Sequence, residues 1–284
     1  QGHELVVLVP SPGLDKPWTI ERSGSVQVVR LAALRTKDTG YVRRTVSELL
    51  LPLAMLRGIR RSPFRSVQWD GIVWYSPSIF LGPLVGVLKR SSSCHSYLIL
   101  RDIFPEWAVD MGLLRRGVVY RAFKLVERYQ YSVADTVGVQ SPSNLGYLTE
   151  WTKKPGRRLE VLQNWLAPAP NVGSSVSVAA TPLSGRTIFV YSGNMGIAQG
   201  MDILLDLAER LTNRRDIGFM FVGRGSEVPR LRSSAEQRGL DNVVFHDEVD
   251  PGEIPGLLAQ CHIGLVALDP RHKTHNVPGK FLTY

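Results

Sequence analysis

The stretch Thr187–Gly200, TIFVYSGNMGIAQG, predicts a buried strand that runs into a glycine-rich turn and then a helix. Its first six residues favour a strand, and apolar side chains recur with helical period after the turn. Gly193, Gly196 and Gly200 allow backbone N–H groups to face a ligand beside the positive end of a helix, which suits a phosphate. Tight strand-to-helix turns also need glycine for steric reasons alone, so the turn by itself leaves both interpretations open.

The glycine spacing is G-x-x-G-x-x-x-G, which differs from the G-x-G-x-x-G of dinucleotide-binding folds. The next strand, Ile217–Val222, ends in Gly223-Arg224-Gly225 and offers no carboxylate for a ribose. These two features disfavour a nicotinamide or flavin site. Further strands at Val243–Phe245 and His262–Leu268, separated by a helix over about 250–260, predict a parallel sheet with helices on both faces.

From Val190 to the end, the chain contains in order the segments YSGNMGIAQGMDILLDLAERL, FMFVGRGSE, GLDNVVFHDEVDPGEIPGLLAQCHIGLVAL and NVPGKFLTY. In order and spacing these segments resemble the nucleotide-sugar-binding half of the retaining family 4 glycosyltransferases. The resemblance is greatest to the branch that builds bacterial surface polysaccharides (O-antigen, capsule or exopolysaccharide). The segment LILRDIFPEWAVDMG in the first half resembles the R-D-L-W-P-E segment of that branch.

The resemblance implies an α/β chain of the GT-B fold, with two Rossmann-like domains and a donor cleft between them. We expect a first domain over residues 1–165, a linker over 166–186 and a nucleotide-sugar-binding domain over 187–284. Gly2–Pro10 resembles the second strand of the fold, so a first strand, its glycine turn and the first helix would precede it. The chain ends at Tyr284, before the last strands and the tail helix, so we expect both ends of the fold to be incomplete.

Positive charge is concentrated in the first half, with 23 Lys and Arg against 13 Asp and Glu up to residue 167, and 11 against 12 after it. Two helical segments, Tyr41–Arg65 and Leu113–Tyr131, interleave this charge with apolar residues. Such helices either pack inward with a solvated basic face or lie on an anionic membrane. No nucleic-acid motif accompanies the charge. The candidate membrane or acceptor contacts are Arg57, Arg60, Arg61, Arg115, Arg116, Arg121 and Lys124.

The two cysteines, Cys94 and Cys261, show neither C-x-x-C nor H-x-x-x-H spacing nearby, so we expect no metal and no disulfide framework. Reduced cysteines in a cytosolic protein are the ordinary interpretation. The most apolar stretch, Ile72–Leu88, is interrupted by Pro77 and Pro83, which favours a buried strand followed by a core helix over a membrane span.

Sugar transfer from a nucleotide diphosphate sugar requires positive groups placed where charge develops on the departing diphosphate. In much of the family an Arg and a Lys on the glycine loop do this, but here Asn194 and Gln199 stand at those positions. Lys280 is then the main candidate, and Arg224 a weaker one. The two glutamates of the family's Glu-x7-Glu motif correspond to His275 and Thr283, neither of which is a carboxylate.

Backbone groups near Phe245 and His246 are expected to contact the nucleobase, and the branch resemblance favours UDP. The candidate donor-binding residues are Gly193, Asn194, Met195, Gly196, Gln199, Gly223, Arg224, Phe245, His246, His275, Lys280 and Thr283.

In the first domain, Arg101 and Asp102 follow an expected strand, with Glu106 one helical turn further on. The resemblance assigns the arginine to sugar or phosphate and the aspartate to a sugar hydroxyl, so these three are the candidate catalytic residues. A strand-end ion pair with helix capping is the alternative. No pair of carboxylates is placed to flank a glycosidic bond, which argues against a glycoside hydrolase.

The function expected is retaining transfer of a sugar from a UDP-sugar to a polyprenyl-diphosphate-linked glycan, without a metal or other cofactor. The enzyme would be cytoplasmic and peripheral at the inner face of the cell membrane. Two alternatives remain open. One is a non-catalytic or degenerate GT-B protein that binds nucleotide sugars, suggested by the uncharged residues at the donor site. The other is an enzyme similar to UDP-N-acetylglucosamine 2-epimerase.

Overall fold

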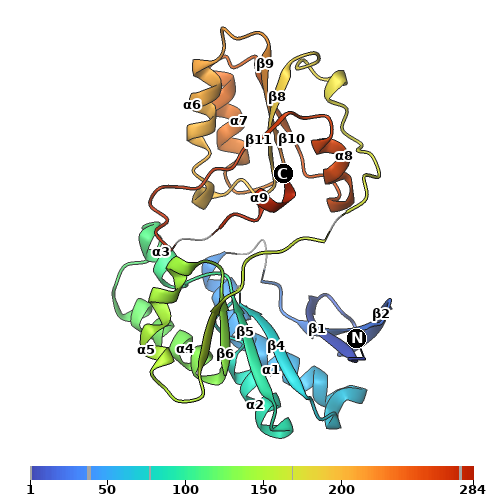
Figure 1. Cartoon of the computed structure of the whole chain (residues 1–284), viewed down its shortest axis with the longest axis vertical. Coiled ribbons are helices and arrows are strands. Elements are labelled where there is room, and N and C mark those ends of the chain that lie inside the picture. Colours follow the sequence, from blue (N-terminus) through green and yellow to red (C-terminus); the bar gives the residue numbers. More distant parts are fainter. Residues whose placement is uncertain (1, 37–39, 77, 168, 275–276) are drawn as a thin grey trace. The chain divides into compact units, whose positions relative to one another are not determined.

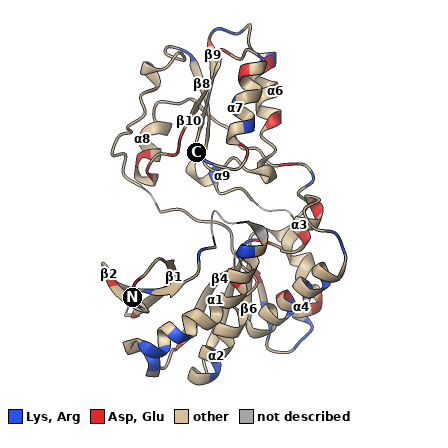
Figure 2. Cartoon of the chain, turned by 180° about the vertical axis from the view of Figure 1, so that it is seen from behind, with Lys and Arg blue, Asp and Glu red and all other residues tan. Residues whose placement is uncertain are grey.

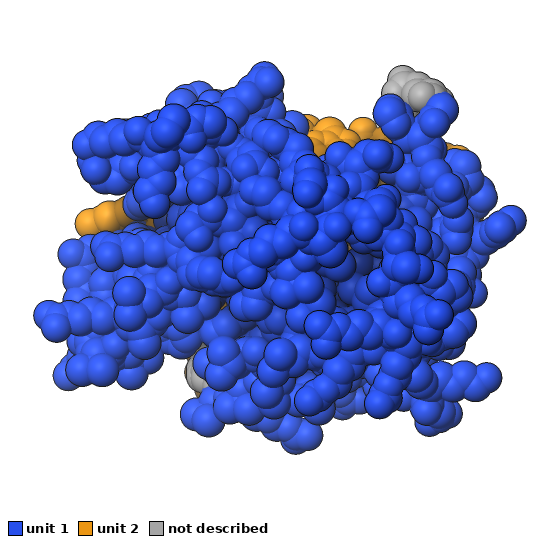
Figure 3. Space-filling view, turned by 90° about the horizontal axis from the view of Figure 1, so that it is seen from below, with its two compact units in different colours: residues 1–163 blue, residues 164–284 orange. Residues whose placement is uncertain are grey.

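The computed structural model describes residues 2–36, 40–76, 78–167, 169–274 and 277–284. The chain divides into two compact units, Gln1–Gln163 and Asn164–Tyr284, which are coloured separately in Figure 3. Each unit is an α/β structure with parallel strands joined by crossover helices (Figure 1). Residues 166–186, the expected linker, all fall in the second unit.

The first unit holds two separate sheets, with strand orders β1-β3-β2 and β4-β5-β6-β7. All neighbouring strands in them are parallel except the antiparallel pair of β2 and β3. Its elements are β1 (Leu5–Pro12), β2 (Trp18–Ser23), β3 (Val26–Ala33), α1 (Tyr41–Arg61), η1 (Pro63–Ser66), β4 (Gly71–Ser76), α2 (Gly82–Ser92), β5 (His95–Leu100), α3 (Glu106–Asp110), α4 (Val118–Val133), β6 (Thr136–Val139), η2 (Pro142–Leu148), α5 (Thr149–Thr152) and β7 (Arg158–Val161).

Apolar periodicity explains how α1 packs in this unit. Leu51, Met55 and Ile59 recur at helical spacing and are buried against Val29 and Leu31 of β3. A second cluster joins β4, β5 and β6 to α2 and α4. The helices therefore cover the sheets with one face each, and the opposite face of α1 is left outside the core.

The second unit is one parallel sheet with strand order β10-β9-β8-β11. Its elements are η3 (Val178–Ala180), β8 (Thr187–Ser192), η4 (Ile197–Gln199), α6 (Asp202–Arg210), β9 (Ile217–Val222), α7 (Val228–Gln237), β10 (Val243–His246), η5 (Pro251–Glu253), α8 (Ile254–Leu258), β11 (Ile263–Gly264) and α9 (Lys280–Thr283).

The central strand β9 is buried along its whole length, as its continuous apolar run predicts. Phe219 and Phe221 pack against α6 and α7, whereas Met220 and Val222 point to the other side and pack near Leu257 of α8. Successive residues of a strand face opposite sides, so this alternation requires helices on both faces of the sheet. The expected two-sided architecture of this unit is present.

The expected linker contributes core residues, which the sequence analysis did not foresee. Val176, Val178 and Leu183 are buried in the cluster that contains Leu257. Leu183 packs directly on Gly218 of β9, where a Cβ would lie only 2.9 Å from its Cδ2 atom. These apolar residues are spaced without helical or strand period, because an irregular segment covers the sheet here. Residues 176–183 are thus part of the second unit and not a free connection.

Three other segments differ from the expectations. The strand β2 was not expected, because its six residues follow a Pro and a loop and alternate only weakly. The sequence of Pro142–Glu150 predicts one helix, but these residues form η2 and the start of α5, since Ser141 and Asn144 cap a 3-10 turn. The strand expected over 262–268 is reduced to Ile263–Gly264. Among the described residues, no helix is both long enough and apolar enough to cross a membrane.

We predict that Leu183→Ala lowers the free energy of unfolding by about 2–5 kcal/mol, because it leaves a cavity against β9. Val172→Ala is the matched control, since Val172 also lies in the expected linker but is 68% exposed, and surface substitutions usually change stability by less than about 0.5 kcal/mol. Urea unfolding of both variants measures the difference. Equal stability of the two would contradict the assignment of Leu183 to the core.

Candidate functional site

Two glycine turns interlock at the carboxyl ends of β8 and β9. The amide of Gly193 donates to the carbonyl of Val222 (2.8 Å), and the amide of Met195 donates to the carbonyl of Arg224 (2.7 Å). Gly223 has a positive φ of 141°, and a Cβ there would overlap the carbonyl of Gly193. Glycine is therefore required at this contact for steric reasons.

The hydrogen bonds of this loop change one expectation. The amides of Gly193 and Met195 donate to β9 and its turn, and the amide of Gly196 donates to Gln199 Oε1 (2.9 Å). Gln199 Oε1 also accepts from Asn194 Nδ2 (3.0 Å). Three of the amides expected to face a diphosphate are thus bonded within the protein. The side chains of Asn194 and Gln199 stabilise the loop as a neutral pair.

Lys280 is the cation at this turn. Its ammonium lies 4.6 Å from the centroid of the Tyr191 ring and 3.4 Å from the position that a Cβ on Gly193 would take. No carboxylate among the described residues lies within ion-pairing distance of it. Burial lowers the pKa of Lys280, because burial disfavours the charged form of a lysine. A half-buried ammonium without a carboxylate is suited to binding an anion.

Tyr284 anchors the helix that carries Lys280. Its hydroxyl accepts a hydrogen bond from the amide of Ser192 at the end of β8 (3.0 Å). Its ring packs against Gly264 of β11, where a Cβ would lie only 2.4 Å from two ring atoms. Lys280 and Tyr284 are one helical turn apart, so the anchored tyrosine fixes where the ammonium lies. Tyr284 is not among the residues expected at this site, although it is the last residue of the segment NVPGKFLTY.

Tyr191, also missed from the sequence, lies fully buried beneath this site. Its hydroxyl donates to the carbonyl of Asn194 (2.7 Å). The same ring therefore supports the glycine loop through its hydroxyl and the ammonium of Lys280 through its face.

The segment after β11 joins the same loop from another side. The amide of Asp269 donates to the carbonyl of Ala198 (3.0 Å), and its carboxylate pairs with Arg271 (2.7 Å). The hydrogen bond from Arg271 lowers the pKa of Asp269. Arg271 is thereby held near the glycine loop, a cation that the sequence analysis did not single out.

Four other expected donor-binding residues have different local roles. Met195 is fully buried in the core, so its side chain does not reach a donor. Arg224 pairs with Glu248 (3.0 Å) in an exposed salt bridge. Phe245 packs edge-to-face on Phe221 and lies beneath the guanidinium of Arg232.

The last of these expected residues is His246, which is exposed. Its carbonyl accepts from the amide of Gly223 (3.1 Å), so its backbone braces the second glycine turn. Thr283 lies exposed on α9. His275 is outside the described residues.

In the first unit, the candidate catalytic residues belong to the end of β5 and to α3. Arg101 is buried, and its guanidinium donates to the carbonyls of Leu162 (2.5 Å) and Gln163 (3.4 Å). Burial lowers its pKa. This arginine ties β5 to the chain after β7, which is a structural role that the sequence did not indicate. Asp102 is half-buried, and its charge adds to burial in raising the pKa of Tyr75.

Glu106 and Lys124 belong to one ion-pair network, which corrects the expectation that Lys124 lies on an exposed basic surface. Lys124 pairs with Glu106 (2.9 Å) and with Glu127 (2.5 Å), and Tyr120 donates to Glu106 (3.1 Å). Burial raises the pKa of Glu127, whereas for Lys124 the bonds to both glutamates outweigh burial and raise its pKa. Lys124 is therefore not part of an exposed basic surface, and Glu106 is bonded within its own unit.

The other six basic candidates are exposed: Arg57, Arg60, Arg61, Arg115, Arg116 and Arg121. Figure 2 shows Lys and Arg gathered at the C-terminal end of α1.

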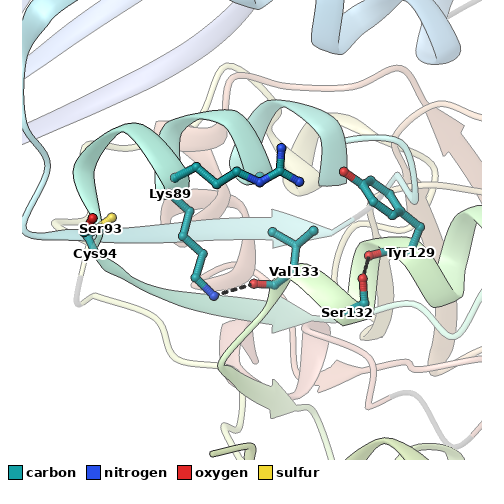
Figure 4. A pocket seen from close by; sticks show the side chains of 8 residues that line it. Lys89, Ser93, Cys94, Tyr129, Ser132 and Val133 are labelled. Atoms are coloured by element: carbon teal, nitrogen blue, oxygen red, sulfur yellow. Dashed lines mark hydrogen bonds between the residues drawn. The ribbon is translucent and has the colours of Figure 1, made fainter.

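A surface pocket of about 480 Å³ lies between α2 and α4, away from every candidate residue. Lys89 lines it and donates to the carbonyl of Val133 (Figure 4), and it also pairs with Asp135 (2.6 Å). Its charge is thus already compensated. The described residues contain no group of three His, Cys, Asp or Glu side chains that could hold a metal ion.

Comparison with known proteins finds similarity to glycosyltransferases. The family described as Glycosyl transferases group 1 matches residues 178–268. The chain is 26% identical over 285 residues to WcaI of Escherichia coli K12, named as a colanic acid biosynthesis glycosyl transferase. That match covers 93% of this chain and 69% of WcaI. It is 25% identical over 189 residues to WbjE of Pseudomonas aeruginosa, named as a glycosyltransferase, covering 64% of this chain and 46% of WbjE.

Solved structures show the same fold. WaaG, a glycosyltransferase involved in lipopolysaccharide biosynthesis, matches with a TM-score of 0.60 and 14% identity over 94% of this chain and 67% of its own. HepE of Anabaena, in complex with UDP and glucose, matches with a TM-score of 0.55 and 14% identity over 86% of this chain and 60% of its own. These structures confirm the expected GT-B fold. Residues 178–268 therefore match the family of glycosyl transferases group 1, and the chain has the GT-B fold.

Proposed function

We propose that this protein is a retaining glycosyltransferase that moves a sugar from a UDP-sugar to a lipid-linked glycan acceptor in surface-polysaccharide synthesis. The observation that carries the proposal is the ammonium of Lys280, held over Gly193 with no carboxylate partner in the part of the chain that the structure describes. An anion at this position would accept a charge-assisted hydrogen bond from Lys280. It would also favour the protonated form of Lys280, which burial disfavours.

The departing diphosphate is the group that this site would stabilise. Negative charge grows on it as the sugar leaves, so a cation fixed in advance lowers the barrier without reorganising at that moment. Tyr191 and Tyr284 fix Lys280 in this way. Retention, by a front-face path in which the diphosphate itself assists, follows from the family resemblance and requires no dedicated protein base.

UDP is the proposed nucleotide because the similar HepE structure contains UDP and glucose. No metal is assigned to the reaction, and the ammonium of Lys280 would offset part of the diphosphate charge. For the acceptor, the exposed arginines of α1 and of residues 115–121 suit a lipid diphosphate or an anionic membrane surface. The protein would then act at the cytoplasmic face of the cell membrane.

A specific observation favours a second candidate, a protein that binds nucleotide sugars without transferring them. Asn194 and Gln199 hydrogen-bond each other where much of the family has two cations. Thr283 is exposed and is not a carboxylate. A donor held by one lysine could bind without being activated.

Donor hydrolysis separates the two candidates. The full chain is incubated with UDP-glucose and UDP-N-acetylglucosamine without acceptor, and free UDP is measured against a Lys280→Ala control. Slow UDP release that depends on Lys280 supports a transferase. Nucleotide-sugar binding with no release above the control would support the non-catalytic candidate.

Lys280→Ala is expected to weaken UDP binding about tenfold or more and to leave uridine binding within about twofold, because only UDP carries the diphosphate. Phe281→Ala, an exposed neighbour on α9, is the matched control and should change neither. Isothermal titration calorimetry measures both ligands. Equal losses for UDP and uridine in Lys280→Ala would remove the diphosphate role.

Tyr284→Phe keeps the ring on Gly264 but removes the acceptor for the Ser192 amide. We expect UDP affinity to fall about fivefold with little change for uridine, since one hydrogen bond of about 1 kcal/mol no longer holds α9 in place. The same calorimetry applies, with thermal unfolding as the folding control. Unchanged UDP affinity in Tyr284→Phe would show that the tyrosine does not position Lys280.

The pH dependence follows from the lowered pKa of Lys280. The ratio of UDP to uridine affinity should be greatest below that pKa and should fall as pH rises through it, before the ordinary lysine value of 10.5 is reached. In the same window the nucleotide-free protein should become more stable with rising pH, because the unfolded state holds more protons. Lys280→Arg stays charged and should remove both trends; their persistence in this variant would assign them to another group.

A further inference from the structure

An exposed tyrosine lies at the carboxyl end of β4. Along this strand Trp74 and Ser76 are buried, whereas Val73 and Tyr75 are 71% and 53% exposed. Successive residues of a strand face opposite sides of its sheet. Trp74 belongs to the cluster that joins β4, β5 and β6 to α2 and α4, so Tyr75 lies on the face turned away from those helices. Packing of the core therefore does not account for this aromatic ring.

Two charged residues lie at the same end of the sheet as Tyr75. The strands β4 and β5 are parallel neighbours in which Ser76 pairs with Leu100, so both strands end at one edge (Figure 1). Arg101 and Asp102 follow β5 directly. Burial and the charge of Asp102 raise the pKa of Tyr75, whereas the charge of Arg101 lowers it, so both charged groups lie near the tyrosine. An aromatic ring, a carboxylate and a guanidinium are thus gathered at this edge.

Side chains from two helices hold the end of β4 in place. The side-chain amide of Gln130 on α4 is fully buried and forms a hydrogen bond with the Ser76 hydroxyl (3.0 Å). The Ser78 hydroxyl donates to the carboxylate of Glu48 on α1 (2.8 Å). These bonds fix the backbone on the carboxyl side of Tyr75. A ring on such a fixed segment is preorganised, so binding would lose little conformational entropy.

The chemistry of this edge suits an uncharged sugar ring. One face of a pyranose carries C–H groups, which pack on an aromatic ring, and its hydroxyl groups can donate to a carboxylate. Arg101 and Asp102 carry opposite charges, so together they give the edge no net charge that would select a phosphate. A neutral polyol with one apolar face therefore matches this edge better than a diphosphate does.

We propose that the ring of Tyr75 stacks on a sugar ring of the acceptor glycan, with the Asp102 carboxylate accepting hydrogen bonds from the hydroxyl groups of that sugar. The inference rests on the proposed function and deepens it, because it assigns the glycan part of the acceptor to the carboxyl ends of β4 and β5. The diphosphate of the donor is assigned to the second unit, which leaves this edge of the first unit to the acceptor. Tyr75 binds the sugar and takes part in no bond-making step.

The test is binding of the methyl glycosides of glucose, galactose and N-acetylglucosamine to the full chain in the presence of UDP, measured by saturation-transfer difference NMR. At least one glycoside is expected to bind, with the strongest saturation on the C–H groups of one ring face. Tyr75→Ala should lower that affinity about fivefold or more, whereas Tyr75→Phe, which keeps the ring, should stay within about twofold of the unchanged chain. Val73→Ala, on the same face of the same strand, is the matched control and should bind as the unchanged chain does.

Three results would overturn the proposal. If Tyr75→Ala binds the glycosides as the unchanged chain does, or if no glycoside binds while UDP does, this edge holds no sugar. If Tyr75→Phe loses as much affinity as Tyr75→Ala, the hydroxyl and not the ring makes the contact. If Tyr75→Ala loses UDP-glucose affinity to the same extent, the ring contacts the transferred sugar.

Two further measurements keep these results separate from other effects. Thermal unfolding checks that Tyr75→Ala is folded, as expected for a residue that is half exposed. UDP binding and UDP release by the unchanged chain report on the proposed function alone. Their absence would overturn the proposed function whatever the glycosides do, whereas their presence without glycoside binding would overturn only the acceptor site.

Discussion

The donor half of the structure depends on the contact between the turns after β8 and β9. A Cβ on Gly223 would overlap the carbonyl of Gly193, and two backbone hydrogen bonds hold the turns together. This contact fixes the end of the sheet as a rigid surface. The loop from Asn194 to Gln199 then closes on itself through a pair of neutral amides. Gly193 and Gly223 therefore allow the two turns to pack together, and the positive charge that could bind a ligand comes from another part of the chain.

That charge comes from Lys280, which lies more than eighty residues after the turn in sequence. Three contacts place it there. The ring of Tyr191 packs against the ammonium, the Tyr284 hydroxyl accepts a hydrogen bond from the Ser192 amide, and the Tyr284 ring packs against Gly264, which has no side chain. None of these partner groups is charged. The site thus holds a cation by packing and hydrogen bonding rather than by pairing it with an acid, and this leaves its charge available to an anion.

The strands β8 and β9 could be predicted to the residue, because the residues of β8 favour a strand and β9 is a continuous apolar run buried on both faces. The GT-B fold was predicted from the order and spacing of four segments. Lys280 was predicted as a diphosphate contact from the resemblance to family 4 glycosyltransferases. Other features have no such signal. Leu183 covers the sheet from an irregular segment, and the direction of a charged side chain does not follow from its position in a helix. Lys124 was therefore expected on an exposed surface, whereas it forms an ion pair with Glu106 inside the first unit. Arg101 was expected to contact a ligand, whereas its guanidinium donates to a backbone carbonyl of the same unit.

A crystal structure of the chain with UDP would show whether Lys280 holds the diphosphate. We expect an oxygen of the diphosphate within hydrogen-bonding distance of Lys280 Nζ, above Gly193, with the ring of Tyr284 still against Gly264. A diphosphate bound to Arg224 or Arg271, with Lys280 remaining on Tyr191 and making no contact to it, would show that Lys280 does not form the diphosphate site.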